Sequence, residues 1–423
     1  MKKENLPCLR LCVCLIITIF VMTAFSQVIA AKDLIINGTV VVLHGEQKYN
    51  RVVIINSGIL YVTHYDGTEG TGMLSIKAKS IFVDAKSSII ANGCGYRGME
   101  NNDGEGPGGG KGGINAVDAG GGGAYGGKGG DGVYDYWNSG IDGRGGEPYG
   151  DAKSVDINMG SAGGAAGSRD GDYGGPGGSG GGLISLQADS IEILGSVSAN
   201  GSDGLIYNND SSGGGSGGGI LMIGNTIAIN RSLITANGGN GGTECGLPQC
   251  ILDDGGGGGS GGRIKIFYRI SCAQNPKKIF VNGGKGAFNG FTGENGTYYK
   301  TKIPVRAVVD IKPDTFNLDR MGNFITAYIE LPDNFDVSDI IPTSILLNNA
   351  VHAESHPIEI GDYDSDNIPD LMIKFNTRAV ISKVFLEYPV ANEVGLTIKG
   401  KLGNGVLFIG TDKVKIVINR SRH

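Results

Sequence analysis

Four aspartates near the C-terminus have the spacing of a cation-binding loop. In the stretch IGDYDSDNIPDLMIKF, Asp362, Asp364, Asp366 and Asp370 occupy positions 1, 3, 5 and 9 of the pattern D-x-D-x-D-x-x-x-D. Carboxylates at alternate positions of a tight loop converge on one point, which suits a hard cation that takes six to eight oxygen ligands. The backbone carbonyl of Ile368, at position 7, is the expected main-chain ligand. The sequence therefore predicts a Ca²⁺ site made by these five residues.

The residues around this loop favour a strand after it rather than a helix. Asn367 stands at the sharp turn, where it tolerates a left-handed backbone. Position 12 is Ile373, so the glutamate that completes an EF-hand is missing, and the apolar run after the loop alternates as a strand does. A calcium loop of an extracellular β-domain fits this pattern; the alternative is a solvated acidic turn that holds no ion.

A separate domain, residues 303–423, carries the loop. Residues 303–422 contain only 7 glycines, although the whole chain contains 77. Seven or eight short apolar segments are separated by turn-like interruptions. Such spacing predicts a small antiparallel β-sandwich of about immunoglobulin size.

A repeat of about 20 residues underlies the glycine-rich part of the chain. Four apolar, alternating segments each close on Asn-Gly: residues 72–93, 182–201, 219–238 and 262–283. Three of them follow a Ser-Gly-Gly step, and the distance from that serine to the closing asparagine is 21, 21 and 22 residues. Regular short strands at this period indicate a parallel β-helix, or β-solenoid, over residues 31–302.

In such a stack the closing asparagines would form a ladder of side-chain amides at one corner. The ladder residues are Asn92, Asn200, Asn237 and Asn282. The alternative is a series of unrelated Asn-Gly hairpin turns. The fold class expected for the whole chain is all-β, a glycine-rich solenoid followed by the sandwich.

A long glycine-rich insert, at about residues 94–181, interrupts the repeat. Residues 101–182 hold 33 glycines in 82 positions. Two interpretations stay open: a flexible linker, or ordered polyglycine in an extended three-fold helix. Tyr134, Tyr136 and Trp137 form an aromatic patch in this insert. They could stack on a sugar ring or on another protein, or simply cover glycine backbone.

The N-terminus has the features of a secretory signal peptide, residues 1–30. Lys2, Lys3 and Arg10 precede an apolar core, and Val28-Ile29-Ala30 supplies small residues for cleavage. We therefore expect a secreted, extracellular or cell-surface protein, with no membrane span once the signal is removed. The formal net charge of -6, without a basic patch, argues against a nucleic-acid partner.

Four cysteines remain after the signal, an even number that suits an exported chain. Cys245 and Cys250 lie in one loop and are expected to pair locally. Cys94 and Cys272 would then close a long loop.

The blocks GGGSGGGI, ANGG and GGGGSGGRI resemble the glycine-rich β-solenoid regions of secreted, adhesin-like microbial proteins and of some plant extracellular proteins. The C-terminal domain, marked by its Asp-x-Asp-x-Asp loop, is similar to modules that end various exported microbial proteins. The resemblance implies export and a structural or adhesive role, and no active site carries over from it.

Catalytic chemistry is not evident in the sequence. The aligned repeats place no column of carboxylates on one face, as polysaccharide-cleaving β-helices need. Arg263, Lys265 and Arg269 read as a solvated basic face of the last repeat. We expect a non-enzymatic protein whose partner is an extracellular glycan or a surface protein. The alternatives are a carbohydrate-binding or carbohydrate-active protein that uses the aromatic insert, and a surface that faces ice or mineral.

Overall fold

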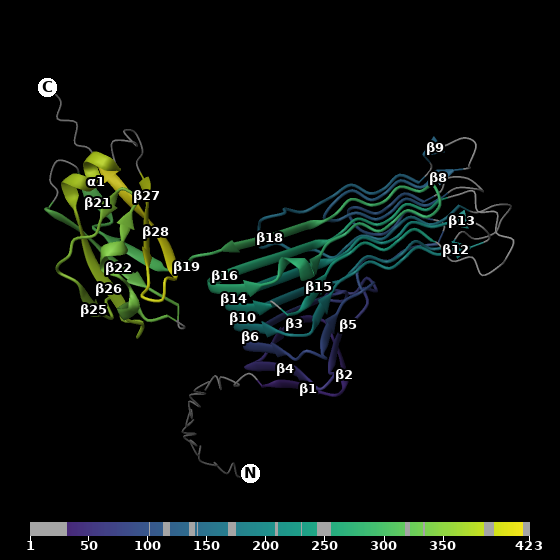
Figure 1. Cartoon of the computed structure of the whole chain (residues 1–423). Helices are drawn as coiled ribbons and strands as arrows, with labels where there is room; N and C mark the ends of the chain where they lie inside the picture. Colours follow the sequence, from purple (N-terminus) through teal and green to yellow (C-terminus); the bar gives the residue numbers. More distant parts are fainter. Residues whose placement is uncertain are drawn as a thin grey trace, which may run out of the picture. The chain divides into compact units, whose positions relative to one another are not determined.

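The computed structural model describes residues 32–417, apart from residues 101, 113–118, 135–139, 142, 168–174, 208–209, 230, 243–254, 318–321, 333–334 and 385–392. Strands dominate these residues, so the all-β prediction is confirmed (Figure 1). The one α-helix among them is α1 (Thr377–Lys383), and short 3-10 turns are η1 (Pro276–Lys278), η2 (Val337–Asp339) and η3 (Pro342–Ser344). None of the described helices has the length and apolar character to cross a bilayer.

A large parallel sheet gathers strands that lie far apart in the sequence. Its order is β1-β4-β6-β10-β14-β16-β18, and β3 also pairs with β6. The strands are β1 (Leu34–Asn37), β3 (Gly45–Lys48), β4 (Arg51–Ile55), β6 (Met73–Val83), β10 (Leu183–Ile193), β14 (Gly219–Ile229), β16 (Arg263–Gln274) and β18 (Thr297–Lys302). Every pairing in this sheet is parallel, so the Asn-Gly steps of the repeat do not close hairpins.

A second parallel sheet contains the strands that follow β1, β4, β6, β10, β14 and β16 in the sequence. Its order is β17-β15-β11-β7-β5-β2. The strands are β2 (Val40–Leu43), β5 (Ile59–Val62), β7 (Ser88–Ile90), β11 (Ser196–Ser198), β15 (Leu233–Thr235) and β17 (Ile279–Phe280). The chain therefore passes from the first sheet to the second after six of the eight strands of the first sheet, whereas β3 and β18 have no such successor.

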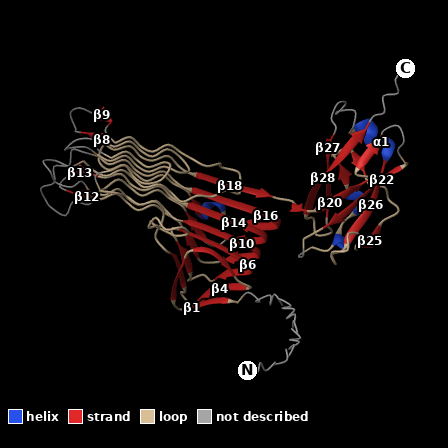
Figure 2. Cartoon of the chain, turned by 180° about the vertical axis from the view of Figure 1, so that it is seen from behind, coloured by secondary structure: helices blue, strands red, loops and turns tan. Residues whose placement is uncertain are grey.

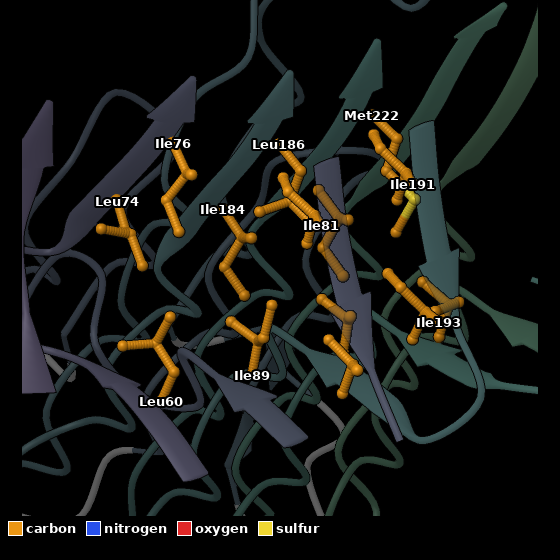
Figure 3. Close-up of a cluster of buried hydrophobic side chains, with 14 of the residues drawn as sticks. Leu60, Leu74, Ile76, Ile81, Ile89, Ile184, Leu186, Ile191, Ile193 and Met222 are labelled. Atoms are coloured by element: carbon orange, nitrogen blue, oxygen red, sulfur yellow. The ribbon is translucent and has the colours of Figure 1, made fainter. Parts of the chain in front are cut away.

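The two sheets share one apolar core because alternate side chains of each strand point inward. Leu74, Ile76 and Ile184 of the first sheet face Leu60 and Ile89 of the second, and all five are fully buried (Figure 3). Burying a side chain of this size stabilises the fold by roughly 1.5–3 kcal/mol. A single repeat cannot bury its inner face, so the core exists only once the repeats are paired.

Outside the sheets, the glycine tracts run side by side as extended rows (Figures 1 and 2). The row of residues 213–218 shows how they bind one another. Successive N–H groups donate in turn to three neighbouring rows, residues 161–164, 257–260 and 199–202, at 2.7–3.0 Å. A backbone with three residues per turn points successive N–H groups in three directions, which accounts for this cycle.

The close approach of the rows explains why glycine recurs there. A Cβ added at Gly215 would lie 2.1 Å from the carbonyl oxygen of Ser179, and one at Gly163 would lie 2.1 Å from that of Gly213. These atoms belong to the backbone and cannot swing aside. The described part of the insert is therefore ordered polyglycine, and the alternative of a loose linker is wrong for those residues.

Two further sheets form the C-terminal part of the chain. The larger has the order β19-β28-β27-β23-β24, and β21 also pairs with β28; the smaller has the order β20-β22-β26-β25. The strands are β19 (Val305–Arg306), β20 (Val308–Lys312), β21 (Thr315–Asn317), β22 (Phe324–Glu330), β23 (Leu346–Leu347), β24 (Val351–His352), β25 (Glu359–Gly361), β26 (Asp370–Asn376), β27 (Glu393–Lys401) and β28 (Leu407–Val417). Both sheets contribute to one apolar core.

The expectation of purely antiparallel pairing is wrong at one strand. β19 and β21 both pair with β28 in parallel, whereas the other pairings in these sheets are antiparallel. Parallel neighbours cannot be joined by a tight hairpin. Here the partner of both short strands comes about 100 residues later in the chain, which strand spacing alone does not indicate.

Two small antiparallel ribbons lie in the glycine-rich part. They are β8 (Val133–Tyr134) with β9 (Gly140–Ile141), and β12 (Ile206–Tyr207) with β13 (Asp210–Ser211).

Candidate metal centre

The aspartate loop connects β25 to β26. These strands pair antiparallel, with Gly361 opposite Asp370, so the two ends of the loop are held together. The sharp path between them needs a left-handed backbone at Ser365 and Asn367, whose φ angles are +66° and +72°. Asparagine tolerates this conformation better than most residues, which is why it can replace glycine at the turn.

Three of the predicted carboxylates converge. Single oxygens of Asp362, Asp364 and Asp370 lie within 4.8 Å of one another. Loop amides hold the aspartates in place: the carboxylate of Asp362 accepts from the N–H groups of Asp366 and Asn367, both at 3.1 Å. The loop geometry is thus set by its own backbone.

Asp366 belongs to a second set of converging carboxylates, and it also contacts the backbone of Ile368. The Asp366 carboxylate accepts from the N–H of Ile368 at 2.8 Å. Asp366 also converges with Asp364 and Glu330, again within 4.8 Å. Ligation by the Ile368 carbonyl stays a prediction.

Glu330 is a candidate ligand that the sequence pattern misses. It lies at the end of β22, directly opposite Asp370 in the register of β22 and β26. Because it is 32 residues before the loop begins, only strand pairing brings it there. No spacing rule in the sequence points to it.

Electrostatics favour a cation at this loop. Burial raises the pKa of Asp370, and the nearby carboxylates of Asp364, Asp366 and Asp362 raise it further, against the lowering effect of the Tyr363 N–H. That N–H donates to Asp370 Oδ2 at 3.0 Å. The ionised form of Asp370 is therefore disfavoured unless positive charge is nearby, and a bound cation would supply that charge.

The structure brings the four repeat asparagines together. Side-chain Oδ1 of Asn92 accepts from the N–H of Asn200, that of Asn200 from Asn237, and that of Asn237 from Asn282, each at 2.8 Å. The side-chain oxygens of Asn92, Asn200 and Asn237 thus each tie one repeat to the next at the same corner.

The three basic residues predicted to form a solvated face do not form one, since Arg263 and Lys265 are buried and Arg269 is half-buried. Arg263 is 5% exposed and Lys265 is 0% exposed. The Lys265 ammonium donates to the carbonyl oxygens of Asp151 (2.6 Å), Ser154 (3.2 Å) and Asp156. The segment that holds these carbonyls crosses the outer side of β16, so the expectation failed because an insert distant in sequence covers the strand.

The predicted long disulfide is also wrong. Cys94 and Cys272 are both free. Cys94 is buried beside β5, where its thiol donates to the Val62 carbonyl at 3.2 Å, and burial raises its pKa to about 11. Cys94 follows β7 of the second sheet, whereas Cys272 lies in β16 of the first sheet, where it pairs with Ile227 of β14.

Some of the other predicted site residues lie outside the part of the chain that the structure describes. Cys245, Cys250, Tyr136 and Trp137 fall there, and Tyr134 is described only as part of the short strand β8.

Comparison with known proteins finds no counterpart. No protein-family model, curated protein or solved structure matches this chain. Its function is therefore inferred from its own residues, chiefly the aspartate loop and the packed glycine rows.

Proposed function

We propose that this chain is an exported, non-enzymatic structural or adhesive protein of the extracellular space or the cell surface. The observation that carries the proposal is the packing of the glycine rows. Each row is hydrogen-bonded to its neighbours in up to three directions, and the rows lead into the parallel strands. Such an array resists bending in every direction across the rows, as an extended scaffold must.

We infer further that the two parallel sheets are faces of one β-solenoid over residues 31–302, and that the C-terminal sheets form a β-sandwich over residues 303–423. Support for the solenoid comes from the alternation of strands between the sheets and from the asparagine ladder. Support for the sandwich comes from the core that its two sheets share.

In this proposal the aspartate loop binds Ca²⁺ and stiffens the C-terminal domain. Asp362, Asp364 and Asp370 would supply one converging set of oxygens, and Glu330 and Asp366 would supply further oxygens that converge with Asp364. Oxygen-only ligands favour a hard cation, and the affinity of extracellular calcium modules is about 0.1–1 mM. Dissociation constants in that range suit an environment outside the cell.

Export and adhesion are tested together. The full chain is expressed with its own N-terminus in a host that has a Sec pathway. We expect the protein in the medium or on the surface, with Ala31 as its first residue by N-terminal sequencing. Beads coated with it should adhere to glycan- or protein-coated surfaces more than beads coated with heat-unfolded protein. An unprocessed chain retained inside cells, or equal adhesion by both bead types, contradicts the proposal.

A further inference from the structure

We propose that a cleft beside the aspartate loop binds one neutral hexopyranose ring, and that the calcium ion forms part of its wall. The cleft encloses about 230 Å³. Its lining includes Asp310 and Lys312 of β20, Tyr328 and Glu330 of β22, and Tyr363 and Asp364 of the loop. This inference rests on the proposed calcium site, because Asp364 belongs to both.

Two tyrosine rings provide the apolar side of the cleft. The rings of Tyr328 and Tyr363 lie 4.6 Å apart with 41° between their planes, and Tyr363 is 43% exposed. The Tyr363 hydroxyl donates to Glu359 at 3.4 Å, and its ring lies against Gly361, where a Cβ would come within 3.2 Å of it. The ring is therefore held in place with one side accessible. A ring of this kind stacks on the C–H face of a sugar while its polar edge stays solvated.

Polar groups beside the tyrosine rings suit the hydroxyl groups of a sugar, since Asp310 pairs directly with Tyr328 across β20 and β22. Glu330 and Asp310 offer carboxylate acceptors. The Lys312 ammonium offers donors and is oriented by Asp310 at 3.1 Å and Asp314 at 2.7 Å. Four carboxylates line the cleft, against one ammonium group and the two positive charges of the proposed ion, so an anionic sugar is disfavoured and a neutral one fits.

The bound ion and the size of the cleft both limit which ligands can fit. Calcium takes six to eight oxygens, and four loop carboxylates that each bind through one oxygen leave positions open, so two adjacent sugar hydroxyls can replace water on the ion. Clefts that enclose drug-sized molecules measure about 300–1,000 Å³. The smaller volume here matches one ring with further sugars extending into solvent.

Saturation-transfer NMR on the full chain tests the inference, with the methyl glycosides of glucose, galactose and mannose and with methyl glucuronide, in calcium and in EDTA. We expect at least one neutral glycoside to bind in calcium with Kd near 1 mM, and more tightly than the glucuronide. Binding should be lost in EDTA. Tyr363→Ala should weaken binding about tenfold and Tyr363→Phe less than threefold. Tyr61→Ala, which removes a comparably exposed ring on β5, should have no effect.

The outcomes separate this inference from the calcium site itself. If calcium raises the melting temperature but no neutral glycoside binds, the cleft inference is overturned and the metal site stands. Glycoside binding that is unchanged in EDTA, or by Tyr363→Ala, also overturns it. If calcium leaves the melting temperature unchanged, the metal site fails and the cleft inference fails with it.

Discussion

Asp364 lies in both groups of converging carboxylates around the loop, the one with Asp362 and Asp370 and the one with Glu330 and Asp366. Replacing Asp364 should therefore weaken calcium binding more than replacing any other single carboxylate of these two groups.

We expect Asp364→Asn to remove most of the stabilisation by calcium. With the ion at 10 to 100 times its Kd, binding to the folded state alone stabilises by roughly 1.4–2.7 kcal/mol. That corresponds to several degrees in melting temperature for a domain of this size. Thermal unfolding with calcium and with EDTA measures the difference. Asp314→Asn, a change at an exposed aspartate outside the loop, is the control and should keep the full response.

Stabilisation by calcium should also depend on pH. The folded-state pKa of Asp370 is raised, so in the absence of metal its ionisation lowers stability as the pH rises from the unfolded pKa through the folded one. Calcium favours the ionised form and competes with protons. The calcium-induced rise in melting temperature should therefore shrink between pH 7 and pH 4. An equal rise at both pH values would show that carboxylates are not the ligands.

The asparagine ladder predicts a difference between an inner and an end position. Asn237→Ala removes the acceptor of the Asn282 N–H and should destabilise by about 1–3 kcal/mol. Asn282→Ala, at the end of the ladder, should cost less, and Asn237→Asp should cost less because it keeps the oxygen. Urea unfolding measures all three. Equal losses for Asn237→Ala and Asn282→Ala would contradict a ladder role.

At the scale of elements, the glycine rows depend on the absence of side chains. Gly215→Ala places a Cβ 2.1 Å from a backbone oxygen, so we expect a loss of about 3 kcal/mol or more. Gly322→Ala is the matched control, since nothing lies within 4 Å of its added Cβ. Alanine at this position lowers the conformational entropy of the unfolded chain, so the free energy of unfolding should stay unchanged or rise slightly. Similar urea midpoints for both variants would refute the close packing of the rows.

At the scale of the molecule, two apolar cores come from separate parts of the chain. The buried members of one lie between Ile36 and Ile266, and those of the other between Val305 and Val414. We therefore expect two calorimetric transitions. Calcium should raise only the one assigned to the C-terminal domain, and Gly215→Ala should lower only the other. A single transition that responds to both changes would contradict independent cores.

The sequence by itself determined the features that depend on local order along the chain. Apolar alternation placed the long strands, the Asn-Gly closures marked one corner of four repeats, and the D-x-D-x-D spacing located a loop whose own amides orient its carboxylates. Each of these features depends on residues a few positions apart or on a recurring period, so it can be predicted from the sequence without the tertiary structure.

Only the tertiary structure decided which distant segments meet. It placed Glu330 opposite Asp370, covered Lys265 with an insert more than 100 residues earlier, and left Cys94 and Cys272 unpaired. It also set the three neighbours of the glycine row 213–218. A glycine tract carries no side-chain pattern that selects a partner. Its neighbours are set by backbone hydrogen bonds and close contacts, and these exist only once the repeats have stacked.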